Sequence, residues 1–254
     1  CFGMDPVLQS QRMKRAGLAQ DLKAVKGVIT SARGLAQGLK EAAKVALAGR
    51  SFLDDAPYSM HVGTEGRTES AVTDALAEVR RIVAAHGGRE VENTIPKVMR
   101  GMRYVPMTSA IGPAGERWLP VHALVRLSDA AETWSAVQAL FASRQAEFDA
   151  HGVKVGVLTA IVGSNAFVLE PVFYWPAPRT LYYERVLDEA TLAKFTDFAA
   201  NPAGEALVFE VRSQLTELFL SRGATHLQIG RTYRYRDGLR PEAWRLLEAI
   251  KRSV

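Results

Sequence analysis

The fold of this chain is decided by the stretch VKVGVLTAIVGSNAFVLEPVFYW, residues 153–175. Its two halves, 153–162 and 166–175, are rich in β-branched and aromatic residues, which favour β-strands. The residues between them, Gly163-Ser164-Asn165, are typical of a tight turn. The sequence therefore predicts an antiparallel β-hairpin.

A strand and a helix are expected immediately before the hairpin. Residues 118–127 alternate as in a half-buried strand. Asp129 and, three residues later, Glu132 form the pattern of a capping box. We predict a helix that begins there and ends at Gly152, because glycine readily adopts the left-handed conformation that closes a helix.

The same order of strand and helix is predicted earlier in the chain. Tyr58, Met60 and Val62 alternate as in a strand. Thr68 is expected to cap a helix that Gly87-Gly88 would end.

Helical patterns fill most of the remaining chain. Apolar residues at steps of three and four predict helices over 6–49, 192–200 and 204–221, and a last helix from Pro241. The residues expected on the inner side of that last helix are Trp244, Leu247 and Ile250.

Together these patterns predict an α+β chain with a ferredoxin-like antiparallel sheet and helices on one face. We divide it into an N-terminal helical segment (1–57), a ferredoxin-like domain (58–222) and a C-terminal segment (223–254).

The sheet face turned away from the helices should carry polar residues among apolar ones. In the strand before the helix, Trp118 and His122 fall opposite the apolar face, and in the second half of the hairpin Glu170 and Tyr174 do so. Apolar walls with a few placed polar groups suit a small aromatic or hydroxylated ligand. The alternative is an ordinary half-exposed sheet face whose polar side chains are solvated.

The composition is that of an ordinary folded protein, with 254 residues of which 48% are hydrophobic and 23% charged. The single cysteine, Cys1, excludes an intrachain disulfide and a C-x-x-C pair. No run approaches the ~18 apolar residues of a membrane span, and no secretory signal pattern is present. We therefore expect a cytoplasmic location and no membrane partner.

The net charge of +5 at pH 7 is spread unevenly. Residues 1–50 hold nine Lys or Arg against three Asp or Glu, and residues 222–254 hold eight against three, around an acidic middle. Because the basic residues do not gather on one recognition element, nucleic acid is not the expected partner.

Common catalytic motifs are absent from the chain. It has no G-x-G-x-x-G, no G-x-x-x-x-G-K-[ST] and no G-x-S-x-G. The histidines have no spacing that argues for zinc. They are His61, His86, His122, His151 and His226.

Four segments stand out by their order and spacing: IPKVMR (95–100), GERWLPVH (115–122), LEPVFYWP (169–176) and THL (225–227). In this order they resemble the substrate (cap) domain of FAD-linked oxidases of the vanillyl-alcohol oxidase/p-cresol methylhydroxylase flavoprotein family. The resemblance covers roughly residues 58–254. It implies that FAD is bound mainly by an N-terminal domain absent from this sequence. It also implies oxidation of an alcohol, hydroxy acid or phenol by hydride transfer to flavin.

Two positions depart from the family pattern. The phenol-oxidising members have a Tyr-Arg pair where this chain has Gly223-Ala224. The hydroxy-acid-oxidising relatives bind a metal at a histidine-containing Gly-Asp-Gly-Asn turn, which corresponds here to Gly163-Ser164-Asn165. The resemblance therefore predicts no metal and leaves the substrate open.

The resemblance also assigns roles to residues. His226 would lie near the flavin as a base or hydrogen-bond donor, and Arg231, with Arg234, would hold a substrate carboxylate or the charge developing on the flavin. His122 and Glu170 would accept the proton of the substrate hydroxyl. The remaining substrate-binding residues would be Tyr174 and Trp118.

The same sequence features allow other interpretations of the function. A ferredoxin-like sheet can serve as a small-molecule binding or dimerisation module without catalysis, and RNA binding by the sheet is a further alternative. If the resemblance holds, the chain alone should bind FAD weakly or not at all. It should also form homo-oligomers through the surface left for the FAD domain.

Overall fold

The computed structural model describes residues 1–14, 56, 58–91, 104, 107–225 and 234–253. The chain forms two compact units. The first holds residues 1–6 and 12–105, and the second holds residues 7–11 and 106–254. These two units are defined by contacts within the chain. The three segments predicted from the sequence (1–57, 58–222 and 223–254) are defined by the functional role expected of each.

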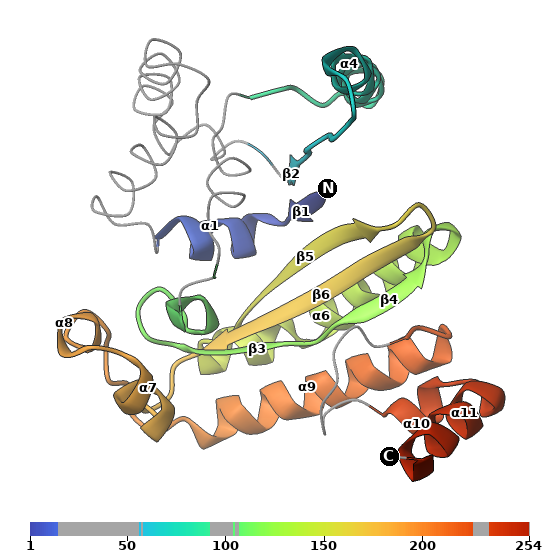
Figure 1. Cartoon of the computed structure of the whole chain (residues 1–254). Helices are drawn as coiled ribbons and strands as arrows, with labels where there is room; N and C mark the ends of the chain where they lie inside the picture. The colour runs from blue at the N-terminus through green and yellow to red at the C-terminus, as the bar shows by residue number, and fades with distance from the viewer. Residues whose placement is uncertain (15–55, 57, 92–103, 105–106, 226–233, 254) are drawn as a thin grey trace. The chain divides into compact units, whose positions relative to one another are not determined.

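The second unit is a ferredoxin-like α+β domain, as predicted. Its strands and two long helices follow one another as in Figure 1: β3 (Arg117–Pro120), β4 (Ala123–Arg126), α6 (Ala130–His151), β5 (Lys154–Val162), β6 (Ala166–Trp175) and α9 (Pro202–Ser221). β6 pairs antiparallel with β5 on one side and with β3 and β4 on the other. Thr225 then forms an antiparallel bridge with Leu124 and so occupies the position of the fourth ferredoxin strand.

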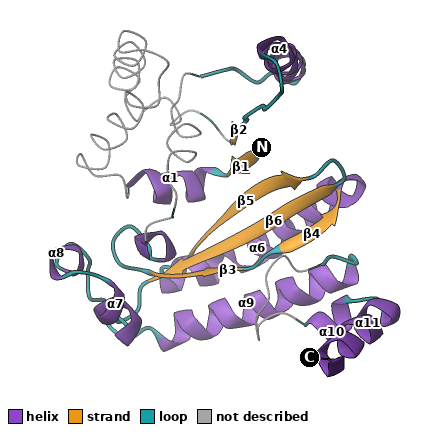
Figure 2. Ribbon diagram, in the orientation of Figure 1, coloured by secondary structure: helices purple, strands orange, loops and turns teal. Residues whose placement is uncertain are grey.

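The two long helices cover one face of this sheet (Figure 2). Val137 and Phe148 of α6 and Val211 and Phe219 of α9 are almost fully buried. They pack with the strand residues of the same face, which include Val121, Ala123, Val125, Val157, Leu169, Phe173 and Trp175. This helix-side core is the main apolar cluster of the unit and holds the strands in register.

Glycines end the elements around the hairpin as expected. Gly152 adopts φ +66° after α6, and Gly163 adopts φ +63° in the turn between β5 and β6. Residues with a Cβ rarely adopt this conformation, so glycine is favoured at both positions. The predicted hairpin is therefore confirmed, with Val162 opposite Ala166.

The predicted strand 118–127 is divided into β3 and β4. Pro120, which has no N–H to donate, ends β3, and Leu127–Asp129 form a 3-10 turn (η3) after β4. Val121 N donates to Pro171 O at 2.8 Å, so the pairing with β6 continues without a shift between the two strands.

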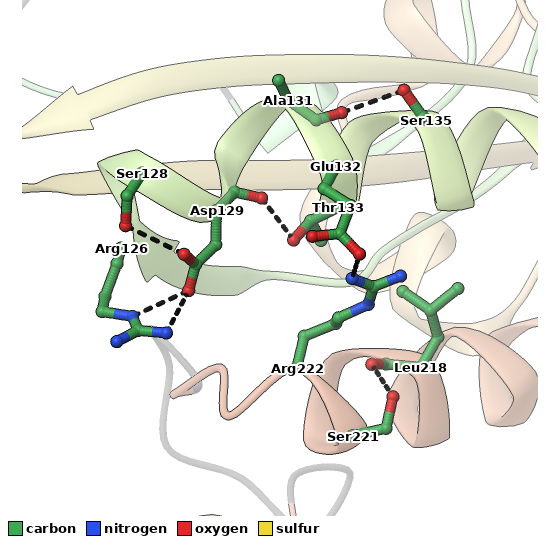
Figure 3. Close-up of polar contacts among 10 residues, drawn as sticks. All are labelled: Arg126, Ser128, Asp129, Ala131, Glu132, Thr133, Ser135, Leu218, Ser221 and Arg222. Carbon is green, nitrogen blue, oxygen red and sulfur yellow. Dashed lines mark hydrogen bonds and ion pairs between the residues drawn. The ribbon is translucent and has the colours of Figure 1, made fainter.

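The predicted capping box at Asp129 and Glu132 is wrong. Asp129 has helical dihedrals, and its carboxylate accepts hydrogen bonds from Ser128 and Arg126 instead of capping α6 (Figure 3). The bonds with Ser128 and then Arg126 hold the pKa of Asp129 below its usual value. Glu132 forms an ion pair with Arg222 at the end of α9. Charged partners outside the helix therefore outcompete the local backbone donors.

Smaller elements complete the unit: η2 (Met107–Ala110), α7 (Leu181–Val186), α8 (Glu189–Leu192), α10 (Tyr235–Gly238) and α11 (Pro241–Ser253). The helix predicted over 192–200 is wrong, because α8 ends at Leu192. The chain turns there instead, with Phe195 N donating to Leu192 O at 3.1 Å, and the guanidinium of Arg179 also donates to the carbonyls of Leu192 and Phe195.

The last helix begins at Pro241 as predicted, but no residue of α11 is buried. Trp244 and Leu247 are half-buried, and Ile250 is exposed. The expected inner side is therefore only partly covered.

The described part of the first unit contains β1 (Phe2–Met4), β2 (Ser59–His61) and α4 (Glu69–Ala85), and α1 (Pro6–Lys14) is divided, with residues 7–11 in the second unit. Thr68 caps α4 by accepting from Ala71 N at 3.2 Å, as predicted. In β2, however, Ser59 and His61 are buried and Met60 is exposed, because the ring of His61 stacks on Phe2 of the paired strand β1. Most of the helix predicted over 6–49 lies outside the described residues.

Because Phe219 fills the helix-side core, F219A should destabilise the protein by about 3–5 kcal/mol. F209A is the matched control on the same helix. Phe209 is 45% exposed, with the guanidinium of Arg212 over its ring, so its loss should cost less than about 1 kcal/mol. Urea unfolding followed by circular dichroism measures both. Equal losses would contradict the assignment of the core.

Candidate functional site

The candidate site lies on the sheet face opposite α6 and α9. Directly paired residues of antiparallel strands project to the same face. Trp118 of β3 and Lys154 of β5 both pair with Tyr174 of β6, and these three residues form the first cross-strand row. Because Leu119 and Phe173 belong to the opposite, helix-side core, this row faces away from the helices.

Two strand residues further along comes an apolar row. Pro120 and Gly156 both pair with Val172, which is completely buried. Gly156 is buried as well, so other parts of the protein cover this middle row.

The next row holds His122 and Glu170 in contact. His122 Nε2 lies 3.2 Å from Glu170 Oε2, and the two side chains are only 6% and 14% exposed. Leu158 pairs with Glu170 from the other side and supplies an apolar neighbour. The structure thus brings together two residues that are far apart in the sequence.

The face is not an ordinary solvated one. His122 is 4% exposed as a residue, and Tyr174 is completely buried. The alternative of a half-exposed face with hydrated polar groups therefore does not describe these residues. In such surroundings an imidazole and a carboxylate are retained together because each offsets the desolvation of the other.

The His122–Glu170 pair can move a proton. A carboxylate beside one ring nitrogen orients the imidazole. An imidazole held in this way can accept a proton from a hydroxyl group, which is the chemistry of a general base. Glu170 would then act through His122 or accept directly.

Trp118 adds a hydrogen-bond donor. Its indole Nε1 is buried and has no acceptor among the residues that the structure describes. A buried donor without an acceptor costs about 1–3 kcal/mol, so this N–H is a natural contact for an oxygen atom of a ligand.

The start of β3 is fixed by bonds to the loop that follows β6. Arg117 Nε donates to Pro178 O at 3.0 Å, and the Tyr183 hydroxyl donates to Glu116 O at 3.3 Å. Gly115 adopts φ +106°, and a Cβ added at this glycine would lie only 2.9 Å from Thr196 O. These contacts hold the backbone that presents Trp118.

In the row beyond His122, the strand β4 pairs with the C-terminal part of the unit. Leu124 pairs with Val168 and exchanges two backbone hydrogen bonds with Thr225, at 2.7 and 2.9 Å. Thr225 therefore belongs to the same face, next to the His122–Glu170 row. His226 and Arg231 lie outside the described residues, so their roles stay predictions.

Arg234 does not contact the candidate site. It forms ion pairs with Asp237 and Glu217, and the hydrogen bond with Asp237 raises its pKa above the ordinary value. Its guanidinium is thus engaged by two carboxylates rather than available for a ligand.

Lys154 was missed from the sequence. Counting back from the three-residue turn places Lys154 opposite Tyr174, so the hairpin register contained the signal.

No metal site is found in the part of the chain that the structure describes, where no three His, Cys, Asp or Glu side chains gather. Within the same part, no helix has the length and apolar character needed to cross a membrane. Comparison with known proteins found no matching family model, no matching curated protein and no matching solved structure.

If His122 and Glu170 stabilise each other, their replacements should not be additive. In a double-mutant cycle with H122Q and E170Q, urea unfolding at pH 7 should give a coupling energy of about 0.5–3 kcal/mol. The control cycle uses R80Q and E90Q, since the pair Arg80–Glu90 is 53% and 64% exposed. That cycle should show much weaker coupling. Coupling at the site no stronger than in this control would contradict a buried, interacting pair.

Proposed function

We propose that this chain is the substrate-binding cap portion of an FAD-dependent oxidoreductase that oxidises an alcohol, a hydroxy acid or a phenolic substrate. The proposal is supported by the resemblance of its four segments to that enzyme family. The observation that carries it is the buried His122–Glu170 pair on the face opposite the helices.

The chemistry follows from the position of this pair. Oxidation of an alcohol removes the hydroxyl proton and a hydride from the adjacent carbon, and the C–O bond becomes a carbonyl. FAD supplies the acceptor for the hydride. His122, held by Glu170, accepts the hydroxyl proton, and the apolar neighbours keep water away from the reacting carbon.

The described residues fit the substrate side of such a reaction. The sequence has neither a G-x-G-x-x-G nor a P-loop to bind a pyrophosphate. FAD would therefore be bound mainly by another domain, and the contribution of this chain would come from His226 and Arg231.

The buried donor of Trp118 also favours a second candidate, a small-molecule binding module without catalysis. Both candidates predict a ligand on this face. Only the first predicts that electrons leave the ligand.

The test uses the natural protein that contains this chain. We expect purified protein to carry flavin and to lose its visible absorbance when mixed anaerobically with an alcohol or hydroxy acid that is a substrate. H122Q should slow this reduction about 10²–10⁴-fold, because a general base contributes roughly that factor.

H86Q is the control, because His86 is exposed at the end of α4. It should leave the rate unchanged. H226A should slow the reduction as well if His226 acts at the flavin. A flavin-free protein, or flavin reduction by H122Q at the full rate, would contradict the proposal.

A further inference from the structure

The largest completely buried side chains of the described residues fall into two groups. Most of them belong to the helix-side core. The others are Leu8 of α1, Ile111 in the loop before β3, and Val172 and Tyr174 of β6. All four lie in the second unit, and none is part of the helix-side core. Because Val172 and Tyr174 belong to the opposite face of the sheet, that face has an apolar core of its own.

The middle row of this face needs a cover from elsewhere in the chain. Val172 is completely buried, and its partner on β5 is Gly156, which is buried too and has no side chain. Glycine within a strand often marks a place where another backbone approaches closely. The loop that carries Ile111 leads into β3, on the other side of β6 from Gly156. Residues 7–11, with the buried Leu8, are therefore the segment that fits over Gly156 and Val172.

This segment is held less firmly than the two long helices. α1 has nine residues, and a helix of that length is marginal in water on its own. Among its described side chains, Leu8 is the only completely buried apolar one, and the other buried residues are Gln9 and Gln11. The side-chain carbonyl oxygen of Gln11 is buried with no donor among the described residues. Such an oxygen has lost its hydrogen bonds to water without replacement, which weakens the packing of α1.

We propose that α1 is a movable cover over the candidate site. In the closed state Leu8 packs on the rows of Tyr174 and Val172 and keeps water from them. In the open state α1 separates from the sheet while the strands, α6 and α9 stay folded, because local opening requires less free energy than global unfolding. The residues on both sides of 7–11 belong to the first unit, so the open cover stays attached to the chain at both ends.

The cover would control access to the proton-transfer pair. The side chains of His122 and Glu170, in the row next to Val172, are only 6% and 14% exposed. A reactant therefore reaches them only when the face opens. This consequence rests on the proposed function, whereas the movable cover itself does not.

Hydroxyl-radical footprinting of the 254-residue chain, measured by mass spectrometry, tests the cover. Tyr174 and Phe173 are neighbours on β6 and are both completely buried, but on opposite faces of the sheet. L8A removes the buried contact of α1, and a lost leucine side chain in a core shifts such an equilibrium by at least about tenfold. Oxidation of Tyr174 should therefore rise about tenfold, while oxidation of Phe173 should not change.

S10A is the matched control, since Ser10 is exposed on the same helix. It should leave the oxidation of both rings unchanged.

Hydrogen exchange of the backbone amides provides the second measurement. The amides of α1 should exchange on the order of 100-fold faster than those in the middle of α6 and α9, because they open locally. Q11M should slow the exchange of α1 about fivefold. Methionine has a similar size to glutamine but has no carbonyl oxygen that would be buried without a donor.

Oxidation of Tyr174 that is unaffected by L8A would overturn the inference. Equal increases for Tyr174 and Phe173 would also overturn it, because α1 would then be part of the global core and not a separate cover. So would amides of α1 that exchange as slowly as those of α6.

These measurements need no flavin, so their failure is distinct from a failure of the proposed function. A cover that opens in a natural protein without flavin reduction would leave a gated face without catalysis. Flavin reduction together with a fixed α1 would leave the enzyme and remove the cover.

Discussion

The candidate site depends on the register of the central strand β6. Its pairing with β5 and with β3 and β4 decides which side chains share a face. A shift of one residue would exchange the two faces and place Phe173 and Leu169 where Tyr174 and Glu170 now lie. The helix-side core prevents this shift, because those two apolar residues are completely buried beneath α6 and α9. Packing on one face therefore fixes the chemistry of the other.

The buried pair His122–Glu170 has a physical cost that ordinary packing would avoid. Apolar residues of similar volume would often be equally stable at such a position or more so. The same sheet face also carries the indole N–H of Trp118, which lacks an acceptor among the described residues. Unsatisfied or desolvated polar groups are uncommon in folded proteins, and where they gather they favour a ligand-binding role.

Local sequence signals predicted much of this fold. The hairpin was predictable because Gly163 marks its turn, and the cap of α4 was predictable because Thr68 reaches a donor three residues away. The predictions failed where a distant partner competes with the local one. Glu132 pairs with Arg222, which is 90 residues away, and the guanidinium of Arg179 binds the carbonyl of Leu192 at the end of α8, 13 residues away. The alternation of apolar and polar residues placed Trp118, His122, Glu170 and Tyr174 on one face, but it could not show that the face is buried. Burial depends on tertiary packing, whereas the alternation of residues only indicates which side chains share a face.

The central claim is that Glu170 holds the imidazole of His122 in surroundings from which water is excluded. Proton NMR of the chain labelled with ¹⁵N-histidine tests it most directly. The account predicts a slowly exchanging ring N–H of His122, assigned to Nε2, that is lost in E170Q. A His122 ring proton that exchanges with water as fast as that of the exposed His86, or that is unaffected by E170Q, would contradict the account.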